Sequence, residues 1–501
     1  MSILGGLLLT HSCETHPVYS YQRACHHDRP FFIVKLMKYA LQTHQRKLLV
    51  DTMTPVNMYL KIRDNYPNSI LLESSDYGVN DNSVAYICFN PIADIKLQNQ
   101  ILTMQFPDGQ SKKIQLLDNE RVAKYCSDFS KQFTGNFKSD RFVSNGLFGF
   151  TSYDAVQHFE DIKFSKKQED FHIPQLYYAL YQNVIAINVF NNEAHLYAHC
   201  FQADSNLDEV VAVLQAPNPT THSFSRQGEP QSNLTDDEFV ELVKKGIYHC
   251  YRGDVFQIVL SRRFSQAFVG DDFTLYRVLR SVNPSPYLFY FDFGDYQIFG
   301  SSPEAQLVVK DGKAEIHPIA GTFRRTGNDK QDAERAKELA KDQKENSEHV
   351  MLVDLARNDL SRNGNQVKVE KNREIQFYSH VIHLVSKVTA MKKENRDTME
   401  IVADTFPAGT LSGAPKHRAM QLIDEYENRS RAFYGGAIGF MDFDGNYNHA
   451  IIIRSFLSKN NVLHYQAGAG VVSESKPENE LQEVYNKLGA LNKALEETEK
   501  L

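Results

Sequence analysis

The sequence predicts a large mixed α/β protein, on three observations. Its 501 residues, of which 42% are hydrophobic, suffice for two to four domains or for one large α/β unit. Apolar strands are joined by tight-turn signals; the Asp311-Gly312 pair, for example, lies between two alternating segments. Amphipathic helical runs lie between the strands, including a long one from Asp332 to Asp354.

The composition argues against several classes of protein. A net charge of -7 and the absence of Lys- and Arg-rich runs give no support to a nucleic-acid or membrane partner. The six cysteines are scattered singly, which predicts neither a zinc site nor a disulfide framework and fits a reducing cytosol. No basic segment precedes the apolar run near the N-terminus, and no stretch approaches the length of a membrane span. We therefore expect a cytoplasmic protein.

The N-terminal part divides into two predicted segments. Residues 1–65 are expected to be a frayed or extended segment with one short helix, opened by Thr54 and Pro55. The histidines and cysteines of this segment match no ligand spacing, so they do not predict a metal site. Residues 66–215 are expected to form an N-terminal subdomain, and its first strand ends at Ser74.

Two further features of this subdomain are predicted. The glycine-rich strand and helix from Asn145 to Glu160 lack the GxGxxG arrangement, so they do not predict a dinucleotide site. The apolar segments Leu176–Asn188 and Ala194–His199 are expected to pair as a hairpin through Asn191-Asn192.

A linker and a capped helix follow. Residues 216–233 are rich in Pro, Ser, Thr, Gln and Gly and are expected to be a linker. Thr235 and Glu238 then form a capping-box pattern for a helix from Asp236 to Arg252. This helix would open a second domain over residues 234–501.

The second domain carries two pairs of glutamates at helical spacing. Glu345 and Glu348 are three residues apart, as are Glu480 and Glu483, and such residues share one face of a helix. Glu348 precedes an apolar run, and Glu483 is followed at helical spacing by residues 485–488, so both are expected to face inward. Two glutamates from separate helices, with water and substrate oxygens, would make a site for Mg²⁺.

Other residues of this domain suggest an anion site. Glu304 follows a Gly-Ser-Ser-Pro turn and is a candidate general acid, a role that requires a raised pKa. Arg454 ends a buried apolar strand, where a guanidinium requires an anionic partner. The Gly468-Ala469-Gly470 segment would let backbone N–H groups approach an anion without obstruction, and Gly321 and Thr322 are expected to do the same.

Eight motifs occur in order in the second domain: GSSPE, HPIAGT, EHVMLVDLARNDL, HVIHLVS, GTLSGAPK, YGGAIG, IIIRS and QAGAGVV. By these motifs the chain resembles the chorismate-utilising enzymes, and most closely their anthranilate synthase component I branch. The resemblance covers residues 235–495 and, more weakly, 71–196. It implies an α/β fold of the α+β type, with two packed subdomains whose mostly antiparallel sheets are flanked by helices.

The resemblance implies roles for particular residues. Glu304 would act on the leaving hydroxyl of chorismate, and His383 would serve a later elimination of pyruvate. Gln257 stands where relatives that add water to chorismate carry a lysine base; a glutamine cannot act as a base, which weighs against that chemistry. Mg²⁺ would be held by Glu348 and Glu483. The substrate would be bound by Gly321, Thr322, Tyr434, Arg454, Gly468, Ala469, Gly470 and Lys487.

Ala320 separates two branches of the family. Aminodeoxychorismate synthases carry a lysine there that forms a covalent intermediate, whereas this chain reads PIAGT. Ammonia would then attack the ring directly, ortho to the carboxylate, which points to anthranilate. No cysteine lies in the Gly-x-Cys-x-Gly elbow of a glutamine amidotransferase. The resemblance therefore implies a separate amidotransferase subunit, component II, in a heterotetramer with two copies of each subunit.

The resemblance also implies feedback inhibition by L-tryptophan. The inhibitor would bind at the strand end marked by Ser74, with Glu73 beside it, and at the Pro286-Tyr287-Leu288 segment. The residues after Ser74 depart from the usual pattern of the family, whereas the Pro286-Tyr287-Leu288 segment is intact.

The resemblance thus implies an anthranilate synthase component I, which converts chorismate and ammonia to anthranilate and pyruvate in tryptophan biosynthesis, with Mg²⁺. One alternative is an aminodeoxychorismate synthase component I, which Ala320 opposes. Another is a catalytically inactive sensor of chorismate or an amino acid, which the complete set of Glu304, Glu348, His383, Arg454 and Glu483 opposes.

Overall fold

The computed structural model describes residues 39–74, 83–117, 121–165, 167, 171–217, 219–377 and 381–500. Residues 1–38, most of the predicted N-terminal segment, lie outside this part. Residues 38–501 form one compact unit. The predicted short helix is present as α1 (Pro55–Arg63), and the Thr54 hydroxyl caps it by accepting a hydrogen bond from the Asn57 N–H.

The strands join edge to edge into one sheet system that closes on itself, and β1–β6 is the only parallel pairing among the described residues. The predicted mostly antiparallel sheets are therefore confirmed. The first strands are β1 (Tyr39–Leu49), β2 (Ile70–Glu73), β3 (Val84–Gln98), β4 (Ile101–Gln105), β5 (Ser111–Gln115), β6 (Phe133–Gly135), β7 (Leu147–Thr151), β8 (Leu176–Asn188) and β9 (Glu193–Cys200). The later strands are β10 (Phe224–Ser232), β11 (Gln257–Gly270), β12 (Tyr287–Asp292), β13 (Gln297–Ser302), β14 (Ala305–Lys310), β15 (Lys313–Ile316), β16 (Ile319–Arg324), β17 (Gly364–Phe377), β18 (Val381–Lys392), β19 (Gly413–Ala414), β20 (Ala437–Met441), β21 (Tyr447–Ile451), β22 (Ser455–Lys459) and β23 (Val462–Val471).

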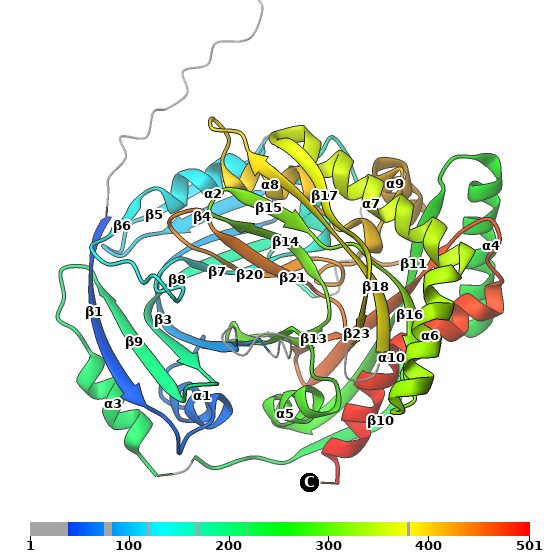
Figure 1. Cartoon of the computed structure of the whole chain (residues 1–501). Coiled ribbons are helices and arrows are strands. Elements are labelled where there is room, and N and C mark those ends of the chain that lie inside the picture. The colour runs from blue at the N-terminus through cyan, green and yellow to red at the C-terminus, as the bar shows by residue number, and fades with distance from the viewer. Residues whose placement is uncertain are drawn as a thin grey trace, which may run out of the picture. The chain divides into compact units, whose positions relative to one another are not determined.

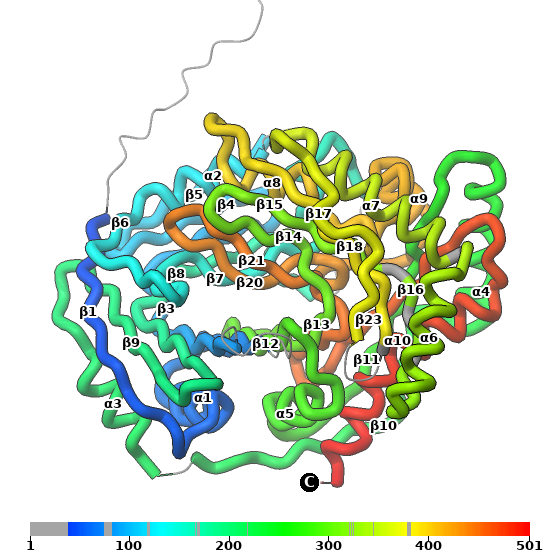
Figure 2. Tube along the Cα trace, viewed as in Figure 1, coloured from blue at the N-terminus to red at the C-terminus, as the bar shows by residue number. Residues whose placement is uncertain are grey.

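Most helices lie on the outer side of the strands, whereas α1 and α5 (Asp272–Val282) lie among the strands and are largely buried (Figures 1 and 2). Those of the first half are α1, α2 (Val122–Ser130), η1 (Tyr153–His158) and α3 (Leu207–Gln215). Those of the second half are α4 (Asp236–Arg252), α5 (Asp272–Val282), α6 (Asp329–Lys341), α7 (Gln343–Asn363), α8 (Thr398–Thr405), η2 (Gly409–Leu411), α9 (Lys416–Tyr426) and α10 (Pro477–Thr498).

Strands from the two halves of the chain alternate within the sheets. β2 pairs with β3 on one side and with β12 on the other, and β7 pairs with β8 and β20. Because hydrogen-bonded strands share a core, residues from both halves are buried in the same hydrophobic clusters. The division into domains at residues 66–215 and 234–501 stays a prediction.

The predicted linker at residues 216–233 is only partly a linker. Its residues 224–232 form β10, which pairs antiparallel with β11. Phe224 is buried, but the strand is otherwise mostly exposed. A strand that buries almost nothing has no need of apolar alternation, which is the signal on which strand prediction depends.

The predicted single helix over residues 332–354 is two helices. α6 ends at Lys341, and Asp342 caps α7 by accepting a hydrogen bond of 2.9 Å from the Glu345 N–H. An Asp followed three residues later by a Glu is a helix-start signal, and here it lies inside a continuous polar run. The second helix carries Glu345 and Glu348 toward the sheet.

Other predicted elements are confirmed. α4 has the predicted bounds and both hydrogen bonds of the capping box between Thr235 and Glu238. β14 and β15 form the predicted hairpin, with Asp311 and Gly312 at φ of 49° and 77°, and β8 and β9 pair as predicted. The Gly-Ser-Ser-Pro-Glu turn is shorter than predicted, because β13 continues to Ser302.

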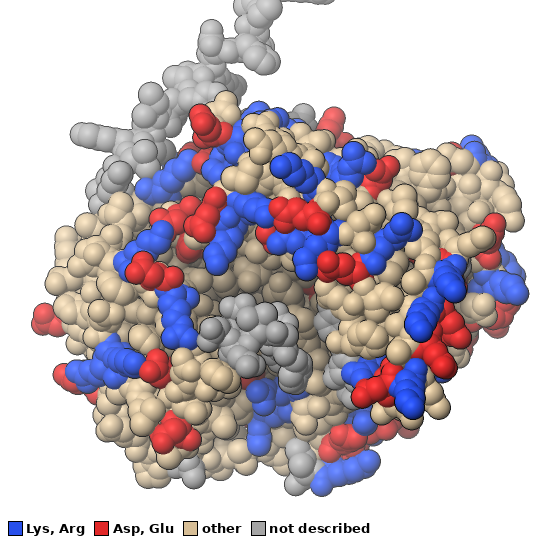
Figure 3. Space-filling view, viewed as in Figure 1, with Lys and Arg blue, Asp and Glu red and all other residues tan. Residues whose placement is uncertain are grey.

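The surface carries charges of both signs. On the face shown in Figure 3, Lys and Arg side chains are interspersed with Asp and Glu side chains, and neither sign forms a broad patch. In the part of the chain that the structure describes, no helix is both long enough and apolar enough to cross a membrane.

Candidate active site

Polar residues from several elements converge beside β23. Arg454 lies in the connection between β21 and β22, Glu304 directly precedes β14, and α10 carries Glu483 and Lys487. The charge of Arg454 interacts with those of Glu304 and Glu483, and the charge of Lys487 interacts with those of Glu483 and Arg454. The fold therefore gathers two acidic and two basic side chains that are distant in sequence.

Glu304 is held by a hydroxyl group and is half-buried. Thr410 Oγ1 donates a hydrogen bond of 2.9 Å to Glu304 Oε1, and the Glu304 carbonyl oxygen accepts one of 3.0 Å from the Ile451 N–H. Burial raises the pKa of Glu304 to about 7, although the Thr410 hydrogen bond and the charges of Lys487 and Arg454 oppose the rise. A carboxyl group with this pKa can donate a proton near neutral pH.

Arg454 combines a strained backbone with a side chain suited to an anion. Its φ of 51° lies in the left-handed region, which is unfavourable for a residue with a Cβ. Its carbonyl oxygen accepts a hydrogen bond of 3.1 Å from the Ser301 N–H. Within the described residues its guanidinium makes no hydrogen bond or ion pair, and burial lowers its pKa. The residue lies beyond the end of β21, at Ile451, and not on the strand as predicted.

The peptide group of Gly468 is engaged by two side chains. Lys487 Nζ donates a hydrogen bond of 2.9 Å to the Gly468 carbonyl oxygen, and the Gly468 N–H donates to the Tyr434 hydroxyl. Burial raises the pKa of Tyr434 to about 12, which keeps the phenol neutral. The Gly468 N–H therefore already has a partner, and binding of an anion by the Gly468-Ala469-Gly470 segment stays a prediction.

The glutamates of α7 face the same region. A Cβ built on Gly321 would lie 3.3 Å from Glu345 Oε2, which places Glu345 beside β16. Leu352 lines a small cavity together with Glu304. Glu348 lies between Glu345 and Leu352 on one face of the helix, and its role in the site stays a prediction.

The glutamates of α10 have different partners. Glu480 accepts a hydrogen bond of 2.7 Å from Ser475 Oγ, and Glu483 lies 3.4 Å from Lys487 Nζ. No three His, Cys, Asp or Glu side chains of the described residues are grouped closely enough to hold a metal ion. A metal here would take at most two protein carboxylates, and Mg²⁺ accepts such a site when water or substrate oxygens complete its coordination.

His383 lies on β18 opposite Thr322 of β16. His383 Nδ1 is 2.9 Å from the Gly321 carbonyl oxygen, so it carries a proton and donates it there. Burial lowers the pKa of His383, which favours the neutral ring with an acceptor at Nε2. The side chains of Ala320 and Thr322 lie outside the described part of the structure.

Gln257 opens β11 with its side chain directed inward. It is 7% exposed, and a Cβ built on Gly470 would lie 2.8 Å from its Nε2. The Gln257 amide therefore occupies the space beside the substrate-binding segment predicted on β23. An amide at this point can donate and accept hydrogen bonds but cannot take up a proton.

The residues predicted to bind an inhibitor are brought together by strand pairing. β2 pairs with β12 so that Glu73 lies opposite Leu288, which places Ser74 at the adjoining end beside Tyr287. The Ser74 N–H donates a hydrogen bond to Val84.

Glu73 itself has another role. Its carboxylate accepts hydrogen bonds from the Tyr276 hydroxyl at 2.8 Å and from Arg280 at 2.7 and 3.0 Å. These partners lie on α5, so Glu73 ties the sheet to that helix and its carboxylate is already satisfied.

A buried ion pair behind the site was not predicted. Arg431 donates hydrogen bonds to Glu427 at 2.6 and 2.9 Å, and also to the carbonyl oxygens of Leu411 and Val259. Glu427 in turn accepts hydrogen bonds from the N–H and hydroxyl of Ser261. The pair links α9, β11 and the η2 segment. An Arg four residues after a Glu is common on exposed helices, so the sequence carries no distinctive signal of this burial.

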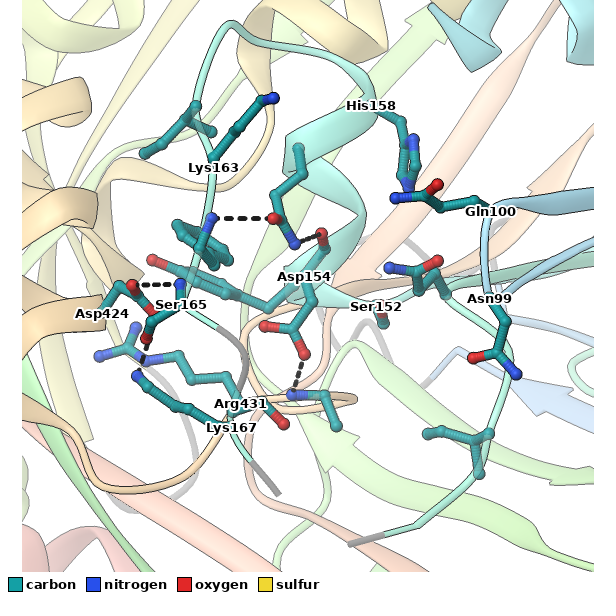
Figure 4. Close-up of a pocket in the computed structure, with 18 of the residues that line it drawn as sticks. Asn99, Gln100, Ser152, Asp154, His158, Lys163, Ser165, Lys167, Asp424 and Arg431 are labelled. Atoms are coloured by element: carbon teal, nitrogen blue, oxygen red, sulfur yellow. Dashed lines mark hydrogen bonds and ion pairs between the residues drawn. The ribbon is translucent and has the colours of Figure 1, made fainter. Parts of the chain in front are cut away.

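A cavity of about 550 Å³ lies on the far side of this ion pair (Figure 4). Its lining includes Asp154, Lys167 and Asp424, and Lys167 pairs with Asp424 at 2.9 Å. Arg431 separates it from the site, with its guanidinium 4.8 Å from the Tyr153 ring centre and 5.8 Å from that of Tyr434. Sequence reasoning did not identify this cavity.

The sequence model of the family described as chorismate binding enzyme matches residues 68–493. Anthranilate synthase component 1 of Aquifex aeolicus is 35% identical over 468 residues, which cover 90% of this chain and 94% of that protein. The protein of the same name from Neisseria gonorrhoeae is 37% identical over 473 residues, with the same coverage.

Solved structures show the same fold. The crystal structure of anthranilate synthase component I from Streptococcus pneumoniae superposes with a TM-score of 0.73 at 32% identity, covering 81% of this chain and 92% of that one. MenF, the menaquinone-specific isochorismate synthase of Escherichia coli, superposes with a TM-score of 0.68 at 18% identity, covering 92% and 96%. At 18% identity, the similarity to MenF shows only that the two proteins share a fold.

Proposed function

The chain belongs to the chorismate-binding enzymes, and we propose that within this family it is an anthranilate synthase component I. It would convert chorismate and ammonia to anthranilate and pyruvate. One observation carries the proposal: a carboxyl group with a pKa near 7, Glu304, lies in the charge field of the Arg454 guanidinium, which makes no hydrogen bond or ion pair with the described residues. Chorismate offers a hydroxyl leaving group to the first and a carboxylate to the second.

Substrate binding would depend on Arg454 and Lys487. The guanidinium can take a carboxylate through two parallel hydrogen bonds, the geometry that makes such pairs strong. Lys487 holds the Gly468 carbonyl oxygen and lies 3.4 Å from Glu483, so its ammonium group supplies charge beside the same strand. Tyr434, Gly321 and Thr322 would complete the walls of the binding site.

Proton transfer would depend on Glu304. Its carboxyl group donates a proton to the departing ring hydroxyl, which leaves as water, and the Thr410 hydroxyl orients the carboxyl. Ammonia forms the new carbon–nitrogen bond ortho to the ring carboxylate. His383, neutral and with an acceptor at Nε2, would take up a proton during the elimination of pyruvate that restores the aromatic ring.

Mg²⁺ would be held by Glu348 and Glu483, with water and substrate oxygens. A bound Mg²⁺ would withdraw charge from the substrate carboxylate and the ring. The chain contributes one glutamate from α7 and one from α10, so binding of the ion would also depend on how these helices are packed against the sheet.

The nitrogen source would be a separate glutamine amidotransferase, component II. The chain has no Gly-x-Cys-x-Gly elbow with which to hydrolyse glutamine. Ala320 offers no nucleophile for covalent capture of the ring, which supports direct attack by ammonia and therefore anthranilate as the product. A heterotetramer with two copies of each subunit and feedback inhibition by L-tryptophan at Ser74, Pro286, Tyr287 and Leu288 belong to the same proposal.

The test uses the purified chain with chorismate, Mg²⁺ and ammonium chloride at alkaline pH. Anthranilate fluorescence, release of pyruvate and the product mass are followed together. The proposal expects anthranilate and pyruvate in equal amounts without any partner protein. Accumulation of an amino-chorismate without pyruvate would contradict it in favour of an aminodeoxychorismate synthase. Binding of chorismate without turnover would contradict it in favour of a sensor.

A further inference from the structure

The buried ion pair of Arg431 and Glu427 contacts the backbone of several segments that carry residues of the candidate active site. The Arg431 guanidinium is fully buried, and each of its three nitrogens donates hydrogen bonds. Nε and Nη2 hold the Glu427 carboxylate. Nη1 donates a hydrogen bond of 2.5 Å to the Leu411 carbonyl oxygen, and Nη2 also donates one of 2.6 Å to the Val259 carbonyl oxygen. Because burial of two charges is costly, the pair depends on all of these hydrogen bonds.

The contact with Leu411 lies beside the residue that holds Glu304. Leu411 follows Thr410 in the three-residue η2 turn, and the Thr410 hydroxyl donates to Glu304. The Leu411 N–H donates to the Ala408 carbonyl oxygen, whereas the Leu411 carbonyl oxygen accepts from Arg431. A single turn of this kind has few hydrogen bonds of its own, so its orientation depends on outside donors. Arg431 therefore anchors the residue that follows Thr410.

The contact with Val259 lies on the strand that begins at Gln257. Val259 is two residues further along β11, so its side chain lies on the same side as that of Gln257, and it pairs with Gly470 of β23. Its N–H donates a hydrogen bond of 3.0 Å to the Ser412 carbonyl oxygen. The Arg431 guanidinium thus bridges β11 and the η2 turn beside a direct hydrogen bond between the same two segments.

Two further contacts of the pair lead to β23 and to Tyr434. Glu427 Oε1 accepts hydrogen bonds of 2.9 and 2.6 Å from the N–H and hydroxyl of Ser261, which pairs with Gly468. The Tyr434 N–H donates a hydrogen bond of 3.1 Å to the Arg431 carbonyl oxygen. One ion pair therefore joins the segments that carry four residues of the site: Thr410, Gln257, Gly468 and Tyr434.

We propose that Arg431 is a positioning residue for proton transfer: by bridging η2 and β11, it holds the Thr410 hydroxyl in hydrogen-bonding geometry on the Glu304 carboxyl. This inference rests on the proposed function, in which Glu304 donates a proton to the departing hydroxyl. The role requires an arginine, because a planar guanidinium presents several donors in fixed directions and a lysine presents one nitrogen. Arg431→Lys therefore keeps the charge beside Glu427 and loses the bridge between the two carbonyl oxygens.

The test is a cycle of two substitutions, assayed with ammonium. Arg431→Lys should lower kcat at least tenfold and leave KM for chorismate within twofold, because Arg454 is untouched. Thr410→Val removes the hydroxyl and should lower kcat at least as much. In the Thr410→Val background, Arg431→Lys should lower kcat less than threefold further, because the contact that Arg431 positions is already lost. A substitution that only weakened the fold would lower kcat by the same factor in both backgrounds.

The pH profile of kcat is a second readout. The Thr410 hydrogen bond lowers the pKa of Glu304, as do the charges of Lys487 and Arg454, which the substitution does not change. At constant free ammonia, the decline of kcat with rising pH should therefore move to higher pH in Arg431→Lys. An unmoved profile would overturn the inference.

Two further variants separate positioning from folding. Arg63→Lys is the matched control, because Arg63 donates hydrogen bonds of 3.1 and 2.7 Å to Asp271 at the start of α5; it should leave kcat and its pH profile unchanged. Arg431→Met combined with Glu427→Leu removes the pair without leaving a buried charge, so this variant should fold and show the same loss of kcat. Wild-type kcat in either variant of Arg431, independent losses in the cycle, or an equal loss in Arg63→Lys would each overturn the inference. Absence of turnover in the wild type would instead defeat the proposed function.

Discussion

Single residues of the candidate site have properties that follow from where they are buried. Glu304 differs from the many surface glutamates of the chain because desolvation raises the pKa of its carboxyl more than the Thr410 hydroxyl and the charges of Lys487 and Arg454 lower it. Arg454 differs from Arg431, whose guanidinium is fully engaged by Glu427 and two carbonyl oxygens. The same residue type therefore stabilises the fold at one position and stays available for a ligand at the other.

Replacement of Glu304 tests proton donation. Glu304→Gln keeps the shape and the hydrogen bond from Thr410 but removes the acidic proton, so kcat with ammonium should fall by about 10²- to 10⁴-fold. Kd for chorismate should change much less, because the carboxylates bind elsewhere. At constant free ammonia, wild-type kcat should decline as pH rises through about 7, where Glu304 loses its proton. A variant that kept the wild-type pH profile would contradict this role.

Glu304→Gln should also change the free energy of unfolding, by an amount that depends on pH. The folded pKa of Glu304, about 7, lies above its ordinary value of 4.5. A group with a raised pKa contributes full stability below the unfolded value, and this contribution is lost as pH rises through the folded value. Glu304→Gln should therefore be more stable than wild type at pH 8, on the order of 2 kcal/mol, and should lose that advantage at pH 4. Urea unfolding at both pH values measures the difference in free energy of unfolding between the variant and wild type. The same difference at pH 4 and pH 8 would contradict the prediction.

Replacement of Arg454 tests carboxylate binding. Arg454→Lys keeps the charge but loses the planar pair of donors, so KM for chorismate should rise about tenfold or more. Arg357→Lys is the control, because Arg357 is exposed and pairs with Asp354 within α7. Steady-state kinetics with ammonium measures both variants. An unchanged KM in Arg454→Lys would show that the guanidinium does not hold the substrate.

At the scale of elements, the break between α6 and α7 positions the acidic face of α7. A single helix over residues 332–354 would carry Glu345 and Glu348 along a straight axis from the solvent side. Capping at Asp342 restarts the helix, and Glu345 then lies beside Gly321. Gly321 has a φ of 69°, and a Cβ there would also meet Leu339 at 2.6 Å. Glycine is thus required where β16 passes under the two helices.

Loss of the α7 cap tests this element. Asp342→Ala removes the acceptor for the Glu345 N–H and should lower the free energy of unfolding by about 1 kcal/mol. The apparent affinity for Mg²⁺ in the ammonium assay should fall as well, since Glu348 lies less than two turns from the cap. Asp329→Ala, on the exposed start of α6, is the control. Normal stability with normal Mg²⁺ dependence in Asp342→Ala would argue against this account.

At the scale of the whole molecule, the two halves of the chain are built into common sheets. β2 comes from the first half and β12 from the second, and their pairing brings Ser74 beside Tyr287. β12 continues through β13 to the segment that carries Glu304. The β2–β12 junction is therefore connected through β13 to the segment that carries Glu304.

Substitution at the junction tests inhibition by tryptophan. Ser74→Ala should raise the L-tryptophan concentration for half-inhibition about tenfold and leave KM for chorismate within twofold, because the hydroxyl lies at the junction and not at Arg454. Ser361→Ala, exposed on α7, is the control. Inhibition curves at fixed chorismate measure it. Unaltered inhibition in Ser74→Ala would remove this residue from the inhibitor site.

Local features of the chain were predictable because their signals are local. The α4 capping box, the hairpin at Asp311-Gly312 and the strand before Ser74 depend on neighbouring residues. β10 was mistaken for a linker because an exposed strand needs no apolar alternation. The division at Asp342 was missed because polar residues continue through it.

The sequence by itself determined the family, because its motifs occur in order, and it picked out Glu304, Glu348, His383 and Arg454 within those motifs as candidates for the chemistry. Only the tertiary structure decided their states. Desolvation and opposing charges act through space, so the pKa of Glu304, the engagement of Gly468 and the satisfied carboxylate of Glu73 depend on segments far along the chain. Exposure is likewise a property of the folded molecule, because it depends on which segments pack over a residue.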